Sequence, residues 1–230
     1  MRTRLTKYLS EFSRLKLTRP IPDHVRLLEI FGVLLTGIGK FIFMDYLNWR
    51  LPFVVVAILA WSSYVYYRYK KDKNVLADWG FRWGNFNTVF KLILPFALTS
   101  IAIFFLVGYI QGSINLTWHI LPLLITYPIW GSIQQFLTIG LLAGNLKDLR
   151  RLKLKKGLII LVTAVFFSMV HYPSIWLMIG TFVLALFYGY VYLKAKNIYV
   201  LGLLHGWLGA LFYYTVVGQD PFADIFLKYL

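Results

Sequence analysis

Long apolar stretches separated by short polar segments dominate the chain from residue 27 onward. Because about 20 apolar residues in helical conformation cross a bilayer, this pattern predicts a helix that spans the membrane for each stretch. The expected spans are Leu27–Leu47, Pro52–Tyr67, Thr88–Ile110, Trp118–Leu146, Gly157–His171, Ile175–Leu193 and Tyr199–Val217. The predicted fold is therefore all-α, a polytopic membrane protein with a bundle of about seven transmembrane helices.

No long polar linker separates the expected spans, so they are predicted to form a single transmembrane domain over residues 27–217. Residues 1–26 precede this domain as a basic segment, and residues 218–230 follow it as a nearly neutral tail. Four apolar residues of the first segment recur at helical spacing: Leu5, Tyr8, Leu9 and Phe12. That segment is either an amphipathic helix on the membrane surface or a solvated tail.

The composition agrees with a membrane protein, because 59% of the residues are hydrophobic and only 14% are charged. A soluble domain of this length averages about 25% charged residues. The chain has no cysteine, which excludes disulfides, thiolate metal sites and a cysteine nucleophile.

The net charge of +15 is concentrated in the N-terminal segment and in the loops after the second, fourth and sixth spans. The loops on the other side carry Arg50 and, in the tail, Lys228. Since positive loops stay in the cytoplasm, we expect a multi-pass protein of the cell membrane with a cytoplasmic N-terminus and a C-terminus outside. The positive charge then sets orientation and meets anionic membrane lipids, and no nucleic-acid partner is expected.

Polar side chains interrupt several of the apolar stretches. Gln134 and Gln135 lie inside the fourth span, His171 ends the fifth, and His205 lies in the seventh. Polar groups at membrane depth usually face other protein groups or a wet cavity, so we expect these three helices to surround a polar pocket. The alternative for each histidine is a hydrogen bond to a neighbouring helix. Lys40 in the first span is a candidate functional residue. The alternative is that its side chain pairs with a neighbouring helix or extends toward the membrane surface.

A metal site cannot be completed from these residues. A catalytic zinc ion needs three protein ligands, whereas His171 and His205 supply two. His119 lies at the outer end of the fourth span, far along the helix from Gln134. A metal remains possible, but the ligands that the sequence offers are incomplete. The cofactor, if there is one, is unknown.

In the order of its motifs, the chain resembles the CPBP intramembrane proteases, also called Abi proteins, which include the type II CAAX prenyl endopeptidases. That family has a Glu-Glu-x-x-x-Arg-Gly helix, a Phe-x-x-x-His helix and a His-x-x-x-Asn (or Asp) helix. The second motif is intact here as Phe167–His171, and the third keeps His205 but has Gly209 in the Asn position. The order and spacing fit from about residue 88 to residue 217.

The first motif is present by position only. Gln134 and Gln135 stand where the two glutamates would be, Ile139 replaces the arginine, and Gly140 matches. The resemblance implies a membrane cavity in which a glutamate activates water, histidines assist, and Asn with His forms an oxyanion hole. In that scheme His171 and His205 are the candidate catalytic residues of this chain.

The differences from the family motifs bear on whether the protein is an enzyme, because an amide cannot take a proton from water as a carboxylate does. The fourth to seventh spans contain no carboxylate at all. The resemblance implies a protein that cleaves or binds a hydrophobic or prenylated peptide in a membrane cavity. The alternative is a catalytically impaired relative that binds a membrane partner or gives immunity to a bacteriocin. A small transporter is less favoured, since neither repeats nor paired charged sites are visible.

Overall fold

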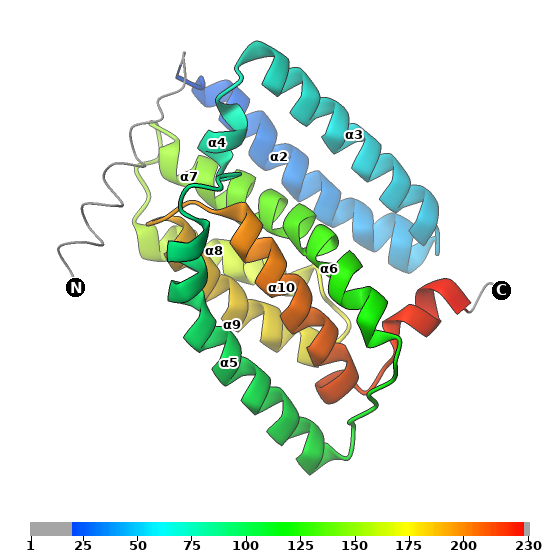
Figure 1. Cartoon of the computed structure of the whole chain (residues 1–230). Coiled ribbons are helices and arrows are strands. Elements are labelled where there is room, and N and C mark those ends of the chain that lie inside the picture. The colour runs from blue at the N-terminus through cyan, green and yellow to red at the C-terminus, as the bar shows by residue number, and fades with distance from the viewer. Residues whose placement is uncertain (1–19, 228–230) are drawn as a thin grey trace. The chain divides into compact units, whose positions relative to one another are not determined.

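The structure is a computed structural model that describes residues 20–227, so the expected surface helix or tail before residue 20 lies outside the described residues. The described chain is helical throughout and contains no strand (Figure 1). The elements are α2 (Asp23–Gly39), η1 (Lys40–Tyr46), α3 (Arg50–Lys71), α4 (Val75–Trp79), α5 (Phe86–Gln111), α6 (Ile120–Gln135), η2 (Phe136–Ala143), α7 (Gly144–Asp148), α8 (Lys156–Met169), α9 (Ile175–Tyr192), α10 (Ile198–Phe212), η3 (Tyr213–Val217) and η4 (Ala223–Leu227), where η marks π-helical turns.

The length and apolar character of these helices confirm a polytopic helical membrane protein. Within residues 20–227, six helices are long and apolar enough to cross a membrane: Asp23–Tyr46, Arg50–Lys71, Phe86–Gln111, Ile120–Asp148, Ile175–Tyr192 and Ile198–Val217. The remaining expected span appears as α8, which has 14 residues. At ~1.5 Å per residue α8 rises only ~21 Å, less than the ~30 Å of a hydrocarbon core.

The helices α8 and α9 form a hairpin around a short turn. Ser168 Oγ donates to the carbonyl oxygen of Met178 across this hairpin at 2.8 Å. The basic loops before α8 and after α9 therefore lie at the same end of the hairpin, whether or not α8 crosses the membrane. The short α8 thus leaves the predicted orientation unchanged, and that orientation stays a prediction.

The described residues divide into two compact units, and each is described by itself. Unit 1 contains the chain up to Arg82 together with Leu137–Lys196, and unit 2 contains Trp83–Phe136 and the chain from Asn197 onward. The single transmembrane domain expected over residues 27–217 stays a prediction.

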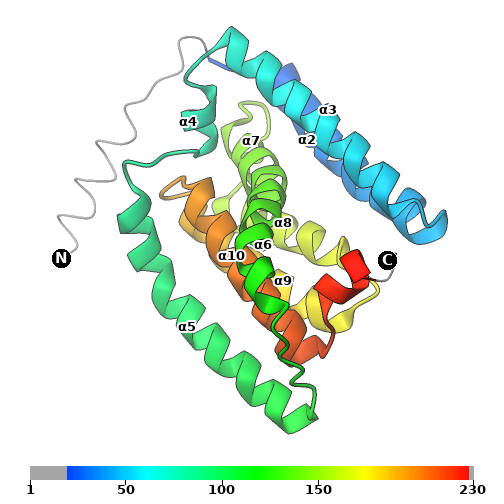
Figure 2. The ribbon, with the colours of Figure 1, turned by 45° about the vertical axis from the view of Figure 1, so that its right-hand side comes forward.

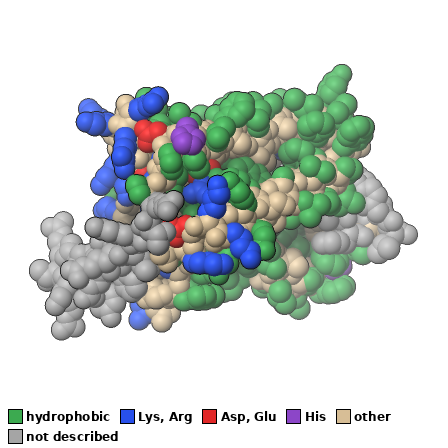
Figure 3. Space-filling model, turned by 90° about the horizontal axis from the view of Figure 1, so that it is seen from above, with side chains coloured by type: hydrophobic (Ala, Val, Ile, Leu, Met, Phe, Trp, Pro, Cys, Tyr) green, Lys and Arg blue, Asp and Glu red, His purple; other side chains and the backbone are tan. Residues whose placement is uncertain are grey.

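In unit 1, α2 packs through one face while α3 remains largely exposed. A Cβ atom added at Gly37 of α2 would lie 2.8 Å from the Phe166 ring of α8, so these two helices are in close contact. Trp61 of α3 donates to Thr36 of α2 at 3.0 Å. Exposed apolar side chains of α3, such as Leu59 at 62% exposed, are suited to lipid. In Figure 3, hydrophobic side chains cover much of the visible face.

A buried polar cluster joins α2, α3 and α7 in unit 1. Glu29, 2% exposed, accepts hydrogen bonds from Tyr64 at 2.6 Å, from Asn145 at 2.6 Å and from Arg68. The Asn145 oxygen accepts in turn from Arg26 at 3.0 Å. A buried carboxylate is tolerated when it is paired and fully hydrogen-bonded, and Glu29 meets both conditions.

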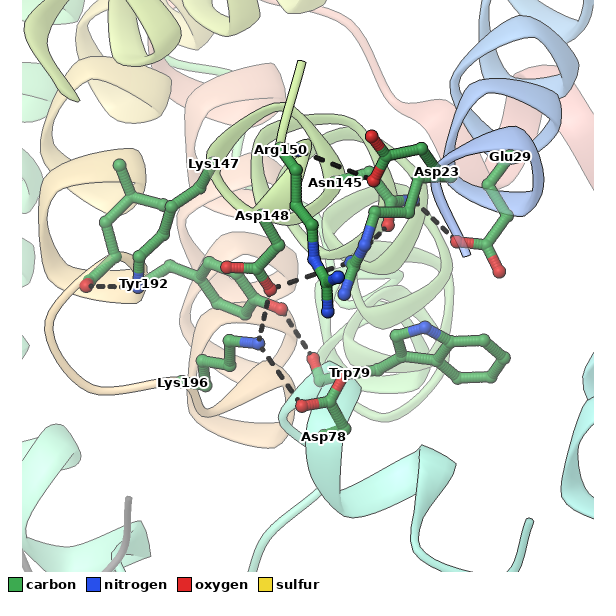
Figure 4. Close-up of polar contacts among 12 residues, drawn as sticks. Asp23, Glu29, Asp78, Trp79, Asn145, Lys147, Asp148, Arg150, Tyr192 and Lys196 are labelled. Atoms are coloured by element: carbon green, nitrogen blue, oxygen red, sulfur yellow. Dashed lines mark hydrogen bonds and ion pairs between the residues drawn. The ribbon is translucent and has the colours of Figure 1, made fainter. Parts of the chain in front are cut away.

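A second set of polar contacts ties α4 to α7 and to the end of α9. Lys196 lies 3.6 Å from the Asp78 carboxylate and 3.8 Å from that of Asp148, and the Tyr192 hydroxyl donates to the Trp79 carbonyl at 2.8 Å (Figure 4). These contacts hold α4 next to the segments that follow α7 and α9 in unit 1.

Lys40, the intramembrane lysine of the first span, is paired. Its Nζ donates to Asp45 Oδ2 at 2.6 Å and to the carbonyl oxygen of Tyr172 at 2.7 Å. The lysine therefore fixes the turn after α8 to η1, which is the pairing alternative expected from the sequence.

In unit 2, α5 and α6 both pack against α10, and α6 runs beside α10 in Figures 1 and 2. Near the C-terminus of this unit, Asp220 holds the end of η3 and the start of α6 together. Its carboxylate contacts Tyr214 at 2.7 Å and His119 Nδ1 at 2.6 Å. Burial raises the pKa of the Asp220 carboxyl, but the hydrogen bonds from Tyr214 and His119 outweigh burial and hold that pKa well below its usual range.

Candidate functional site

Small residues let α6 and α10 approach each other backbone to backbone. A Cβ atom added at Gly206 would lie 2.3 Å from the Pro128 nitrogen, and one at Gly202 would lie 2.1 Å from Ser132 Oγ. A Cβ atom at Gly131 of α6 would lie 2.6 Å from the carbonyl oxygen of Gly202. Glycines at such an interface are typical of closely packed membrane helices, and here they determine how near the polar groups of the two helices come.

This close approach brings Gln134 and His205 together. The imidazole Nε2 of His205 lies 2.8 Å from Oε1 of Gln134. Because an amide oxygen can only accept, Nε2 of His205 is the donor of this hydrogen bond. His205 is 9% exposed, so this hydrogen bond lies largely inside the protein.

Gln135, the next residue, ends α6 and is 0% exposed. Within the described part of the chain, neither its Nε2 nor its Oε1 has a hydrogen-bond partner. The backbone changes to π-helix directly after it, in η2. Insertions of π-helix occur frequently at functional sites, and this one covers the remainder of the first family motif.

The second motif lies in unit 1, where α8 ends in the turn that carries His171. His171 Nδ1 lies 2.7 Å from the carbonyl oxygen of Phe167, four residues earlier, and the two rings pack edge to face at 4.9 Å between centroids. The carbonyl can only accept, so Nδ1 donates and the neutral ring keeps its lone pair on Nε2. The Phe-x-x-x-His spacing thus fixes both the position and the tautomer of this histidine.

The remaining motif positions carry no polar side chain. Ile139 is 0% exposed and contributes only apolar packing. Gly209 of α10 has room around it, since an added Cβ atom would meet nothing nearer than Tyr127 Cδ1 at 3.9 Å. The oxyanion donor of the family's third motif is therefore missing as a side chain.

The expected site residues lie in both units. The structure brings Gln134 together with His205 in unit 2 and holds His171 in its own turn in unit 1. The expectation that the fifth span joins the other two around one pocket stays a prediction. Ser132, which lies against Gly202, is not among the residues expected from the sequence, although Gly131 and Ser132 before the glutamines are a signal for close helix packing.

The sequence does not decide whether the protein binds a metal ion, and the structure shows which possible ligands lie close together. Among residues 20–227, no group of three or more His, Asp or Glu side chains lies close enough together to hold a metal ion. The identity of any cofactor stays unknown.

These features define a multi-pass helical membrane protein whose intramembrane histidines are each held by a hydrogen bond within its own unit. The family model described as type II CAAX prenyl endopeptidase Rce1-like matches residues 32–211. The chain therefore belongs to this Rce1-like family, which confirms the resemblance inferred from its motifs. No curated protein and no solved structure matches the chain.

Proposed function

We propose that this Rce1-like protein binds a hydrophobic or prenylated peptide in the membrane without hydrolysing it by the glutamate route of its family. The observation that carries this proposal is the 2.8 Å hydrogen bond between Gln134 Oε1 and His205 Nε2. It puts a neutral amide, already bonded to the histidine, at the motif position where the family has a carboxylate to activate water.

The expected loss of rate can be estimated from the groups that are missing. A general base contributes about 10²–10⁴ in rate, which is roughly 3–5 kcal/mol of barrier, and an amide at position 134 cannot act as one. An oxyanion donor contributes about 3–4 kcal/mol, and Gly209 has no side chain to donate. The two losses need not add, because residues that act as a unit are not independent.

Binding requires less of these residues than catalysis does. His171 donates from Nδ1 to the Phe167 carbonyl, so the lone pair on its Nε2 can accept a hydrogen bond from a ligand. The apolar helices around them suit a lipid chain or an apolar peptide. Membrane lipids surround the protein in any case, and we further propose that the basic loops face the cytoplasm.

The test uses the purified full-length protein in lipid nanodiscs with a fluorescent farnesylated tetrapeptide that ends in a CAAX sequence. Fluorescence anisotropy measures binding, and mass spectrometry measures release of the C-terminal tripeptide. We expect saturable binding and no tripeptide above the level of empty nanodiscs. Robust turnover that disappears in His171→Ala or His205→Ala would overturn the proposal, because a histidine or a metal-bound water would then be the base.

A further inference from the structure

Gln135 differs from the other buried polar side chains of unit 2. Asn197 donates to Asn85 at 2.6 Å, Thr215 donates to a carbonyl of its own helix at 2.7 Å, and His205 is bonded to the neighbouring α6. Gln135 is just as buried, yet both its amide nitrogen and its amide oxygen are unpaired within the described residues.

An amide in this condition is unfavourable for the fold alone. A buried donor or acceptor without a partner loses its hydration and gains nothing in return, and in a membrane protein no bulk water replaces the lost bond. A methionine or leucine would fill the same volume without that penalty. The side chain therefore calls for a hydrogen-bonding partner beyond the described residues.

The position of Gln135 indicates where that partner binds. Gly131 precedes it by four residues, so the two lie on the same face of α6. A Cβ atom at Gly131 would lie 3.1 Å from Cδ2 of His205, which shows that this face looks toward α10 near the histidine. Gln134, the immediate neighbour, is the residue that bonds to His205.

We propose that Gln135 recognises the backbone of the bound peptide. Its Nε2 donates to a peptide carbonyl and its Oε1 accepts from a peptide N–H, because a side-chain amide and a peptide bond have complementary donors and acceptors. This inference rests on the proposed function and assigns the backbone contact to one residue. Such a contact is independent of peptide sequence, so the lipid and the apolar side chains would supply selectivity.

The experiment compares wild type, Gln135→Met and the matched control Thr163→Val in the nanodisc binding assay and in thermal unfolding without peptide. Thr163 is also 0% exposed, and its hydroxyl also has no partner among the described residues, but it lies outside the three motifs. We expect Gln135→Met to weaken peptide binding about tenfold, which corresponds to the loss of one or two hydrogen bonds. Both variants are expected to unfold at or above the wild-type temperature, because each removes only unpaired polar atoms.

A second arm uses tetrapeptides with a single N-methylated amide. One such peptide should bind less well to the wild type and show no further loss in Gln135→Met, since both changes remove the same bond. Equal affinity of the wild type and Gln135→Met for the unmodified peptide would overturn the inference and leave the proposed function intact. A Gln135→Met protein with a lower unfolding temperature would overturn it too, because the amide would then be part of the fold. A wild type that binds no peptide would overturn both proposals.

Discussion

The glycine contact between α6 and α10 predicts a large difference between two chemically identical substitutions three residues apart. In Gly206→Ala the new Cβ atom would lie 2.3 Å from the nitrogen and 2.5 Å from the Cα atom of Pro128. These are backbone atoms, so the clash is relieved only if the two helices separate. In Gly209→Ala the nearest atom is a ring carbon of Tyr127 at 3.9 Å, an ordinary contact.

The magnitude follows from these distances. Overpacking a well-packed interior typically costs about 1–3 kcal/mol, and we place Gly206→Ala at the upper end, about 3 kcal/mol, because backbone atoms block the new methyl group. Gly209→Ala should instead stabilise α10 by about 0.5–1 kcal/mol, since alanine forms helix more readily than glycine. With about 2–4 °C per kcal/mol for a chain of this size, the two unfolding temperatures should differ by roughly 10 °C.

Intrinsic tryptophan fluorescence during heating in detergent suits this comparison, because the chain has 8 Trp and no Cys for thiol dyes. Gly157→Ala serves as a second control, since an added Cβ atom there meets nothing within 4 Å. A wild-type unfolding temperature for Gly206→Ala, or an equal loss of stability in Gly209→Ala, would contradict the backbone contact between α6 and α10 at Gly206. Loss of the Gln134–His205 hydrogen bond is the expected local consequence of separating the helices.

Three further outcomes are expected. Glu29→Gln should destabilise unit 1 by about 3 kcal/mol in thermal unfolding, because it leaves buried positive charge uncompensated; an unchanged unfolding temperature would contradict the buried cluster. A reporter that is active only outside the cell should work when fused after Leu230, and a cytoplasmic signal would refute the orientation. Cysteines placed at Gln134 and His205 should cross-link with a short reagent, without background from native cysteines, and failure would mean that the two side chains do not meet.

The sequence predicted the helices well because the lengths of apolar runs and the basic loops carry that information locally. It did not predict the π-helical segments η1 to η4, since the spans are apolar on nearly all sides and a change in residues per turn leaves no visible signal there. The apolar stretch Gly157–His171 predicts a span, and the structure forms the 14-residue helix α8 there. The bounds of the other spans differ from the structure mainly at helix ends, where interfacial residues continue the helix.

The polar sites also differ in how much of each can be predicted from neighbouring residues in the sequence. Polar side chains inside apolar stretches predict that the fourth, fifth and seventh spans surround one pocket. The structure pairs Gln134 with His205, and the pocket itself stays a prediction. The partners of Glu29 could not be predicted, because Tyr64 and Asn145 lie 35 and 116 residues away along the chain. Hydrogen bonds over such separations leave no periodic signal in one sequence.

The departures from the first family motif are consistent with one another electrostatically. The family pattern places two carboxylates and one guanidinium on a single helix, and this chain has amides at 134 and 135 and an isoleucine at 139. An arginine at the fully buried position 139 would be an uncompensated charge once the glutamates were gone, and such a charge is strongly destabilising. Replacement of all three removes every formal charge from the motif and keeps its polar hydrogen-bonding capacity in the two amides. The neutral amides thereby support the proposed binding of a neutral peptide in place of activation of water.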